Sequence, residues 1–186
     1  MLKQIISPIL IILALLGIYF GAILPFKKAQ LFIDAYRVFD SQQTVRSLED
    51  SFTKALDFYS PIGQEEARRY LGSRLLSLFV KQMPKEVSNE IISYYESWFN
   101  FKNENKSGLN WTQNLLVLGN LHQSAWNIFK DEKDYISAEN YYLEGLKLSS
   151  TRPQFFYGLQ ELYKSKGDTE KEQAITNTIN KLWPSK

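Results

Sequence analysis

The chain has 186 residues, with 22 lysines and arginines against 20 acidic residues, one histidine and no cysteine. The lack of cysteine excludes disulfide bonds, thiolate metal sites and cysteine nucleophiles. Three of the basic residues and none of the acidic ones lie in residues 1–28, so residues 29–186 carry 19 basic and 20 acidic side chains. This balance argues against a nucleic-acid partner, which would need clustered positive charge.

An uncharged, strongly apolar segment runs from Gln4 to Phe26. At about 1.5 Å of rise per residue, a helix of this length matches the ~30 Å hydrocarbon layer of a bilayer. The segment therefore predicts a single transmembrane anchor over residues 1–28, whose helix continues through Phe39 with a kink at Pro25. The predicted membrane-anchor residues are Ile5, Leu10, Leu13, Leu16, Phe20 and Leu24.

Two other interpretations of this segment stay open: a cleaved secretory signal peptide and a buried core helix. Signal peptides have a shorter apolar core and a small-x-small cleavage site, whereas Phe20-Gly21-Ala22 places a bulky ring where a small residue is needed. Cleavage near residue 22 would release a soluble secreted binding protein. The basic residues on the two sides of the segment are nearly balanced, so charge leaves the orientation in a membrane open.

Helical periodicity continues after the apolar segment. Apolar residues recur every three or four positions over 45–59, 67–79 and 87–99. The polar run Asn100–Gly108 follows and is expected to form the longest loop. We therefore predict divergent helical repeats over residues 29–108.

Residues 109–186 carry small, apolar and aromatic residues at offsets that resemble the tetratricopeptide repeat, a helix-turn-helix unit of about 34 residues. Leu118, Gly119, His122, Ala138, Tyr142 and Gly145 occupy these positions in one unit, and Leu159, Tyr163, Gly167, Ile179 and Pro184 occupy them in a second. In this family the small residues let two helices cross closely and the aromatic rings fill the space beside them. The spacing from Gly119 to Ala138 is longer than the family's.

These patterns together predict an all-α fold with one N-terminal transmembrane helix. After that helix we expect a right-handed α-solenoid of antiparallel helix pairs, in which residues 109–186 form tetratricopeptide-like repeats. The amphipathic stretch 169–182 is expected to serve as the C-terminal capping helix of the array.

A wider resemblance covers most of the chain. The segments ALDFYSPIGQEEARRYL and AENYYLEGLKLSSTRPQFFYGLQELYKSKGD, placed after one apolar span, resemble the C-terminal tail of bacterial O-antigen ligase/polymerase-like membrane proteins that end in tetratricopeptide repeats. Enzymes of that family transfer lipid-linked glycans by means of many membrane spans and large loops. No residue here matches their catalytic part, so the resemblance implies such a tail without its catalytic body.

The sequence offers no constellation of residues for catalysis. His122 is the only histidine, so no second histidine or cysteine completes a metal or nucleophile site, and we predict that it packs between helices. Glu65-Glu66 followed by Arg68-Arg69 is typical of ion pairs on a solvated helix face. We expect no catalytic residue, no cofactor and no metal.

Adjacent aromatic residues, such as Tyr94-Tyr95 and Tyr141-Tyr142, are typical of ring packing between repeat helices. The alternative is a groove in which a peptide lies or sugar rings stack. Such a groove would be lined by the first helix of each pair, at Asn114, Val117, Leu121 and Tyr157.

Two hypotheses of function follow. The first is a non-enzymatic, membrane-anchored scaffold that holds a protein partner at the membrane, in connection with cell-surface glycan assembly. The second is a C-terminal fragment or split half of an O-antigen ligase/polymerase-like glycosyltransferase whose multi-span catalytic part lies elsewhere.

Overall fold

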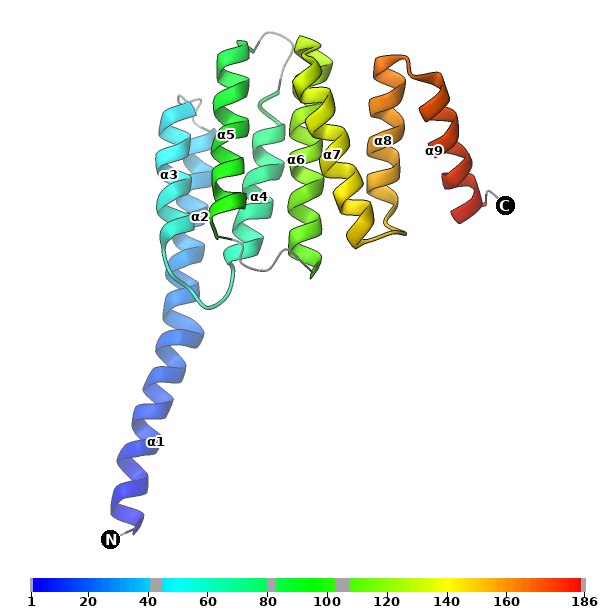
Figure 1. Cartoon of the computed structure of the whole chain (residues 1–186). Helices are drawn as coiled ribbons and strands as arrows, with labels where there is room; N and C mark the ends of the chain where they lie inside the picture. The colour runs from blue at the N-terminus through cyan, green and yellow to red at the C-terminus, as the bar shows by residue number, and fades with distance from the viewer. Residues whose placement is uncertain (1, 41–44, 80–82, 103–107, 185–186) are drawn as a thin grey trace. The chain divides into compact units, whose positions relative to one another are not determined.

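A computed structural model describes residues 2–40, 45–79, 83–102 and 108–184 (Figure 1). All secondary structure in these ranges is helical, which confirms the predicted all-α class. The chain divides into two compact units, Met1–Arg68 and Arg69–Lys186, and each unit is described by itself below. The boundaries expected after residues 28 and 108 mark changes of sequence pattern and do not coincide with this division.

The first unit begins with a continuous helical rod. It consists of α1 (Leu2–Ile18), the π-helical turn η1 (Tyr19–Ile23) and α2 (Leu24–Asp40). Over Pro8–Val38 the rod is long and apolar enough to cross a membrane. The large apolar side chains from Ile9 to Ile23 are 41–61% exposed, so nothing in the described part of the chain covers them. The predicted N-terminal apolar helix is therefore confirmed.

The wide turn η1 lies directly before Pro25, where the sequence predicted a kink. Proline has no N–H and its ring crowds the carbonyl of the preceding turn. In η1 the N–H of Leu24 bonds the carbonyl of Tyr19, five residues back, so the helix widens where the proline enters it. The rod thus continues past Pro25 as α2.

The predicted anchor residues fall into two groups. Leu10, Leu13, Leu16 and Phe20 are exposed along the rod, whereas Leu24 is buried, one turn before Lys28. The side chain of Ile5 lies outside the described residues. Packing within the first unit therefore begins at the end of the apolar segment.

α2 packs against α3 (Val45–Asp57) in the first unit. α3 buries Leu48, Phe52, Ala55 and Leu56, a spacing that places one apolar stripe on one face of the helix. Phe32 and Tyr36 of α2 set their rings edge-on to Phe52, each at a centroid distance of 6.0 Å. After α3, a short connection leads to α4 (Gln64–Leu76), whose first turn closes the unit.

The second unit contains the remaining helices, each in contact with the next along the chain. From α6 to α9 consecutive helices alternate in direction (Figure 1). The bounds are α5 Lys85–Lys102, α6 Gly108–Phe129, α7 Glu132–Leu148, α8 Pro153–Lys166 and α9 Thr169–Leu182. The predicted polar loop is partly helical, because α5 continues to Lys102 and α6 begins at Gly108, and residues 103–107 lie outside the described ranges.

The last helices begin and end at residues suited to helix caps. The Asp131 side chain accepts a hydrogen bond from the N–H of Lys133 at the start of α7, and Asp168 does the same for Lys171 at the start of α9. Gly167 ends α8 with a φ of 78°, a left-handed conformation that glycine adopts without strain. A helix therefore stands at residues 169–182, where the sequence predicted one.

Candidate functional site

The residues assigned to repeat packing lie mostly inside the second unit. Nine of the eleven are buried, namely Leu118, Gly119, His122, Ala138, Tyr142, Gly145, Leu159, Tyr163 and Ile179. Gly167 is exposed as the C-cap of α8, and Pro184 is exposed after α9. Most of these side chains are thus in contact with neighbouring helices rather than with solvent.

Two glycines of this set mark close approaches between helices. The position of a Cβ on Gly119 is occupied by the ring of Tyr142, and that on Gly145 by the ring of Phe155. Tyr142 and Phe155 are fully buried. The hydroxyl of Tyr142 bonds the side-chain amides of Asn120 and Gln123, which satisfies its polar end inside the packing.

His122 is the centre of a polar cluster formed by three helices. Its Nδ1 lies 2.9 Å from Oδ1 of Asp134 on α7, and its Nε2 lies 3.2 Å from Oε1 of Glu96 on α5. The hydroxyl of Tyr141 donates to the same Glu96 oxygen at 2.9 Å, while its ring stacks on the imidazole at a centroid distance of 5.6 Å. One imidazole thereby connects α5, α6 and α7.

The electrostatics of the cluster favour a charged histidine. Burial by itself lowers the pKa of His122, but the hydrogen bonds to Asp134 and Glu96 and the charges of these carboxylates raise it above its usual value. The hydrogen bond from His122 lowers the pKa of Glu96, against the opposing effect of burial. Burial raises the pKa of the Tyr141 phenol, so Tyr141 remains a neutral donor. The geometry thus favours an imidazolium between the carboxylates of Asp134 and Glu96.

This arrangement has a structural character. Asp134 and His122 are only 6% and 5% exposed, so a substrate has little access to either. Among the described residues, no group of three or more histidine and carboxylate side chains is placed to hold a metal ion. The cluster is accordingly a buried polar network that joins α5, α6 and α7.

The four positions predicted to line a groove do not share a surface. Asn114, Val117 and Leu121 are 2%, 7% and 0% exposed, and only Tyr157 is open to solvent, at 50%. The reason is that α6 packs against α5, α7 and α8, which leaves it little free face. Asn114 accepts a hydrogen bond from the buried Tyr95 hydroxyl at 3.0 Å. As placed, these three side chains belong to the core and line no open groove.

A second polar feature lies in the first unit, where the apolar rod meets α3. Lys28 is 3% exposed, and its ammonium donates to the carbonyls of Ala55 at 3.0 Å and Phe58 at 2.8 Å, and to the side-chain oxygen of Gln64. The last carbonyls of a helix lack intrahelical partners and carry the negative end of its dipole. Lys28 is thus a cationic C-cap for α3, supplied by the neighbouring helix.

Gln64 completes this cap from the other side. Its Nε2 donates to the carbonyl of Leu56 at 2.9 Å, while its Oε1 accepts from Lys28. The connection between α3 and α4 is in this way fixed to α2 at the level of Lys28. The sequence showed Lys28 only as a charge flanking the anchor, because its partners lie 27 to 36 residues further along the chain.

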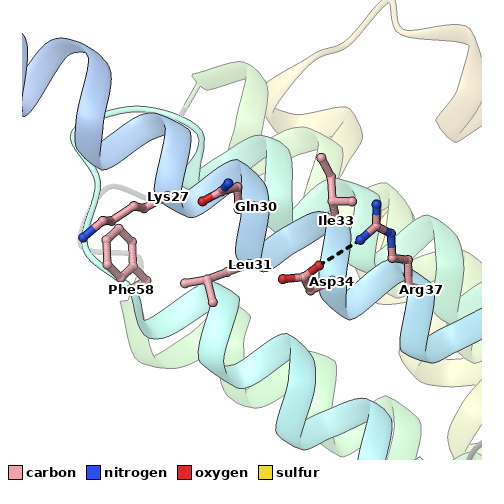
Figure 2. A pocket seen from close by; sticks show the side chains of 7 residues that line it. All are labelled: Lys27, Gln30, Leu31, Ile33, Asp34, Arg37 and Phe58. Atoms are coloured by element: carbon pink, nitrogen blue, oxygen red, sulfur yellow. Dashed lines mark hydrogen bonds and ion pairs between the residues drawn. The ribbon is translucent and has the colours of Figure 1, made fainter.

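Beside this cap lies an open hollow of about 590 Å³ on α2, shown in Figure 2. Phe58 stands at one end of the hollow next to Lys27, and the ion pair between Arg37 and Asp34, at 3.4 Å, stands at the other. The lining residues are Lys27, Gln30, Leu31, Ile33, Asp34, Arg37 and Phe58. Side chains of both positive and negative charge line the hollow, and they do not point toward one common group.

Comparison with known proteins adds no family to these observations. No family model, no curated protein and no solved structure matches this chain.

Proposed function

We propose that the protein is a non-enzymatic, membrane-anchored scaffold whose helical part binds a protein partner close to the bilayer. The observation that carries the proposal is the rod of the first unit. Its apolar side chains from Ile9 to Ile23 are exposed, and the same helix continues into α2, which packs on α3. A lipid-seeking segment is therefore joined without a flexible break to a folded segment.

Solvation explains why a bilayer suits this rod. Burying one Leu or Ile side chain in an apolar medium is worth about 1.5–3 kcal/mol. A long row of such side chains in water is unfavourable, and exposed apolar surfaces of this extent mark membrane or protein contacts. Between Pro8 and Phe26 the chain carries no charge, so lipid can cover this part of the rod completely.

The finer proposal is that the second unit is a right-handed solenoid of tetratricopeptide-like repeats. The antiparallel neighbours α6 and α7, with Gly119 against Tyr142, support it. The close approach of α8 at Gly145 and Phe155 supports it as well. Stacked helix pairs of this kind present extended surfaces to proteins, and an anchor raises the effective concentration of such a surface for a membrane-bound partner. The connection with glycan assembly rests on the sequence resemblance alone.

The anchor is tested by membrane fractionation of the full-length chain. We expect it to resist alkaline carbonate extraction, and a chain that starts at Leu24 to be extracted. The double variant Leu13→Arg with Leu16→Arg should also be extracted, because each arginine costs about 2.5–3.5 kcal/mol at the centre of a span. Asn177→Arg, an exposed position on α9, is the matched control and should stay in the membrane.

Two results would contradict the anchor. Extraction of the unaltered chain by carbonate would show that the rod is not held by lipid. A mature protein that begins near residue 22, seen by N-terminal sequencing, would show that the rod is a cleaved signal peptide instead.

A further inference from the structure

We propose that the connection Phe58–Gln64 is a second membrane contact, in which Tyr59 and Ile62 insert among the lipid headgroups at the level where the N-terminal rod leaves the bilayer. This inference rests on the proposed membrane anchorage of the rod. It assigns to a short loop of the first unit a ligand of defined chemistry, the interfacial layer of a phospholipid membrane.

The composition of the connection is the first argument. No charge occurs from Phe58 to Gln64, between Asp57 and the acidic pair that follows. Tyr59 is 68% exposed and Ile62 is 61% exposed, although both are large and apolar. Two such side chains on one short turn form a small apolar patch, and covering it with another apolar phase is favourable in proportion to the apolar area removed from water.

The local fold turns both side chains outward. Ser60 is buried, and its hydroxyl donates to the carbonyl of Ile62 at 2.8 Å, which closes the chain into a tight turn. Gly63 has a φ of 87°, so the turn ends in a conformation suited to glycine before α4 begins. The Ser60 hydroxyl is thus bonded within the turn, whereas the two apolar side chains are exposed to solvent.

The position of the loop along the rod is the second argument. Lys28 bonds the carbonyl of Phe58 at 2.8 Å, so the loop is fixed beside α2 at this residue. Phe26, the last apolar residue of the uncharged segment, is 64% exposed and lies two residues earlier, about 3 Å along the helix axis. Figure 1 shows the connection after α3 beside the N-terminal end of α2. The loop and the end of the uncharged apolar segment therefore lie at the same height along the helix axis of the rod.

The chemistry of this level matches a bilayer interface. Tyrosine is enriched where membranes meet water, because its ring is apolar and its hydroxyl is polar. Lys27, exposed beside the loop, can extend its ammonium toward phosphate groups. Because lipid already surrounds the rod up to Phe26 in the proposed anchorage, the same lipid surface is the partner that Tyr59 and Ile62 meet next.

The test uses the absence of cysteine in the chain, which permits single labels on the full-length protein. Separate variants Leu13→Cys, Ile62→Cys and Asn177→Cys are labelled with an environment-sensitive nitrobenzoxadiazole dye and reconstituted into vesicles of phosphatidylcholine and phosphatidylglycerol. Dye emission is measured in these vesicles, and its reduction is then measured with lipids that carry a spin label either near the headgroup or deep in the acyl chain. Leu13 reports on the anchor, Ile62 on the loop and Asn177 on a water-exposed site.

We expect a blue-shifted emission at Ile62 that the shallow quencher reduces most, a blue-shifted emission at Leu13 that the deep quencher reduces most, and a water-like emission at Asn177. A lipid signal at Leu13 with a water-like signal at Ile62 overturns the loop contact and leaves the anchor standing. A water-like signal at Leu13 overturns the anchor itself. A second label at Tyr59→Cys should repeat the Ile62 result, and a water-like signal at both loop positions rules out a local effect of one substitution.

Discussion

The imidazole of His122 and the carboxylate of Asp134 lie 2.9 Å apart, Nδ1 to Oδ1, although they belong to different helices, α6 and α7. Both residues are almost fully buried. A buried carboxylate is tolerated only where it is paired, because an isolated charge loses its hydration without compensation. The pair therefore fixes how α6 lies against α7, and Glu96 extends this constraint to α5.

Removal of His122 should destabilise the second unit. In His122→Ala the buried Asp134 loses its donor, and a hydrogen bond to a charged group is worth about 1.5–3 kcal/mol. The four tryptophans all lie beyond residue 69, so tryptophan fluorescence during urea unfolding of the full chain in detergent reports on this unit.

A double-mutant cycle with Asp134→Ala separates the pair from its surroundings. Once one partner is absent, removal of the other should cost less, and the interaction energy should be well above zero. Simple additivity of the two single losses would contradict a direct interaction between His122 and Asp134.

The same cluster should make stability depend on pH. The pKa of His122 is higher in the folded protein than its ordinary 6.5, because the hydrogen bonds to Asp134 and Glu96 outweigh the opposing effect of burial. The folded state therefore holds this proton more tightly than the unfolded state. The resulting stability is fully present below pH 6.5 and is lost as pH rises through the raised pKa. The other groups around the imidazole are Tyr141 and, next to Glu96, Lys133.

Glu96 should affect stability at acidic pH, unlike His122. The hydrogen bond from His122 lowers its pKa from the ordinary 4.5, so its contribution is present above that value and is lost only as pH falls through the lowered pKa. We expect urea midpoints to decline as pH rises above 6.5, and this decline to be absent in His122→Asn. An identical slope in both proteins would show that other groups determine it.

Local sequence patterns were sufficient for the class of the fold. The all-helical architecture and the apolar N-terminal helix follow from periodicity and composition, which depend on residues close together in the chain. The long-range partners were not predictable in this way. Glu96 is 26 residues from His122, and only the packing of α5 on α6 brings the two together.

The sequence also did not show that α6 is buried on more than one face. Asn114 was predicted to line a groove because it lies on the first helix of a repeat pair, but its side chain accepts a hydrogen bond from the hydroxyl of Tyr95 inside the unit. A helix that packs against several neighbours needs buried residues around most of its circumference. A single sequence shows that α6 is apolar on average but not which neighbours cover each face.

A larger residue at Gly145 should disturb the contact between α7 and α8. A Cβ there would overlap the ring of Phe155, which is fully buried. Overpacking of a core costs about 1–3 kcal/mol, more than the gain of up to about 1 kcal/mol that alanine brings to a helix. Gly145→Ala should therefore lower the urea midpoint of the second unit.

The control for this substitution is Asn140→Ala, at an exposed position on the same helix. Alanine has a higher helix propensity than asparagine, so this change should leave the midpoint unchanged or raise it slightly. A gain of stability in Gly145→Ala would mean that Phe155 moves aside easily, and the close approach would then set no limit on how α8 packs.

The cap at Lys28 should protect the end of α3 from opening. In Lys28→Met the carbonyls of Ala55 and Phe58 lose a buried donor. Leaving such groups without a donor costs about 1–3 kcal/mol, which lowers the free energy of local opening and speeds amide exchange. We expect faster hydrogen–deuterium exchange in peptides that cover residues 55–64 of the full chain in nanodiscs.

Lys27→Met is the matched control, because it removes the same charge from the neighbouring residue, which is exposed. Exchange over residues 55–64 should be unchanged there, and peptides from α7 and α8 should be unchanged in both variants. Equal exchange in Lys28→Met and Lys27→Met would mean that the loop is held without the ammonium. Lys28 would then not determine where Tyr59 and Ile62 lie along the rod. The two variants therefore distinguish a lysine that caps α3 from a lysine that is only a charge beside the apolar segment.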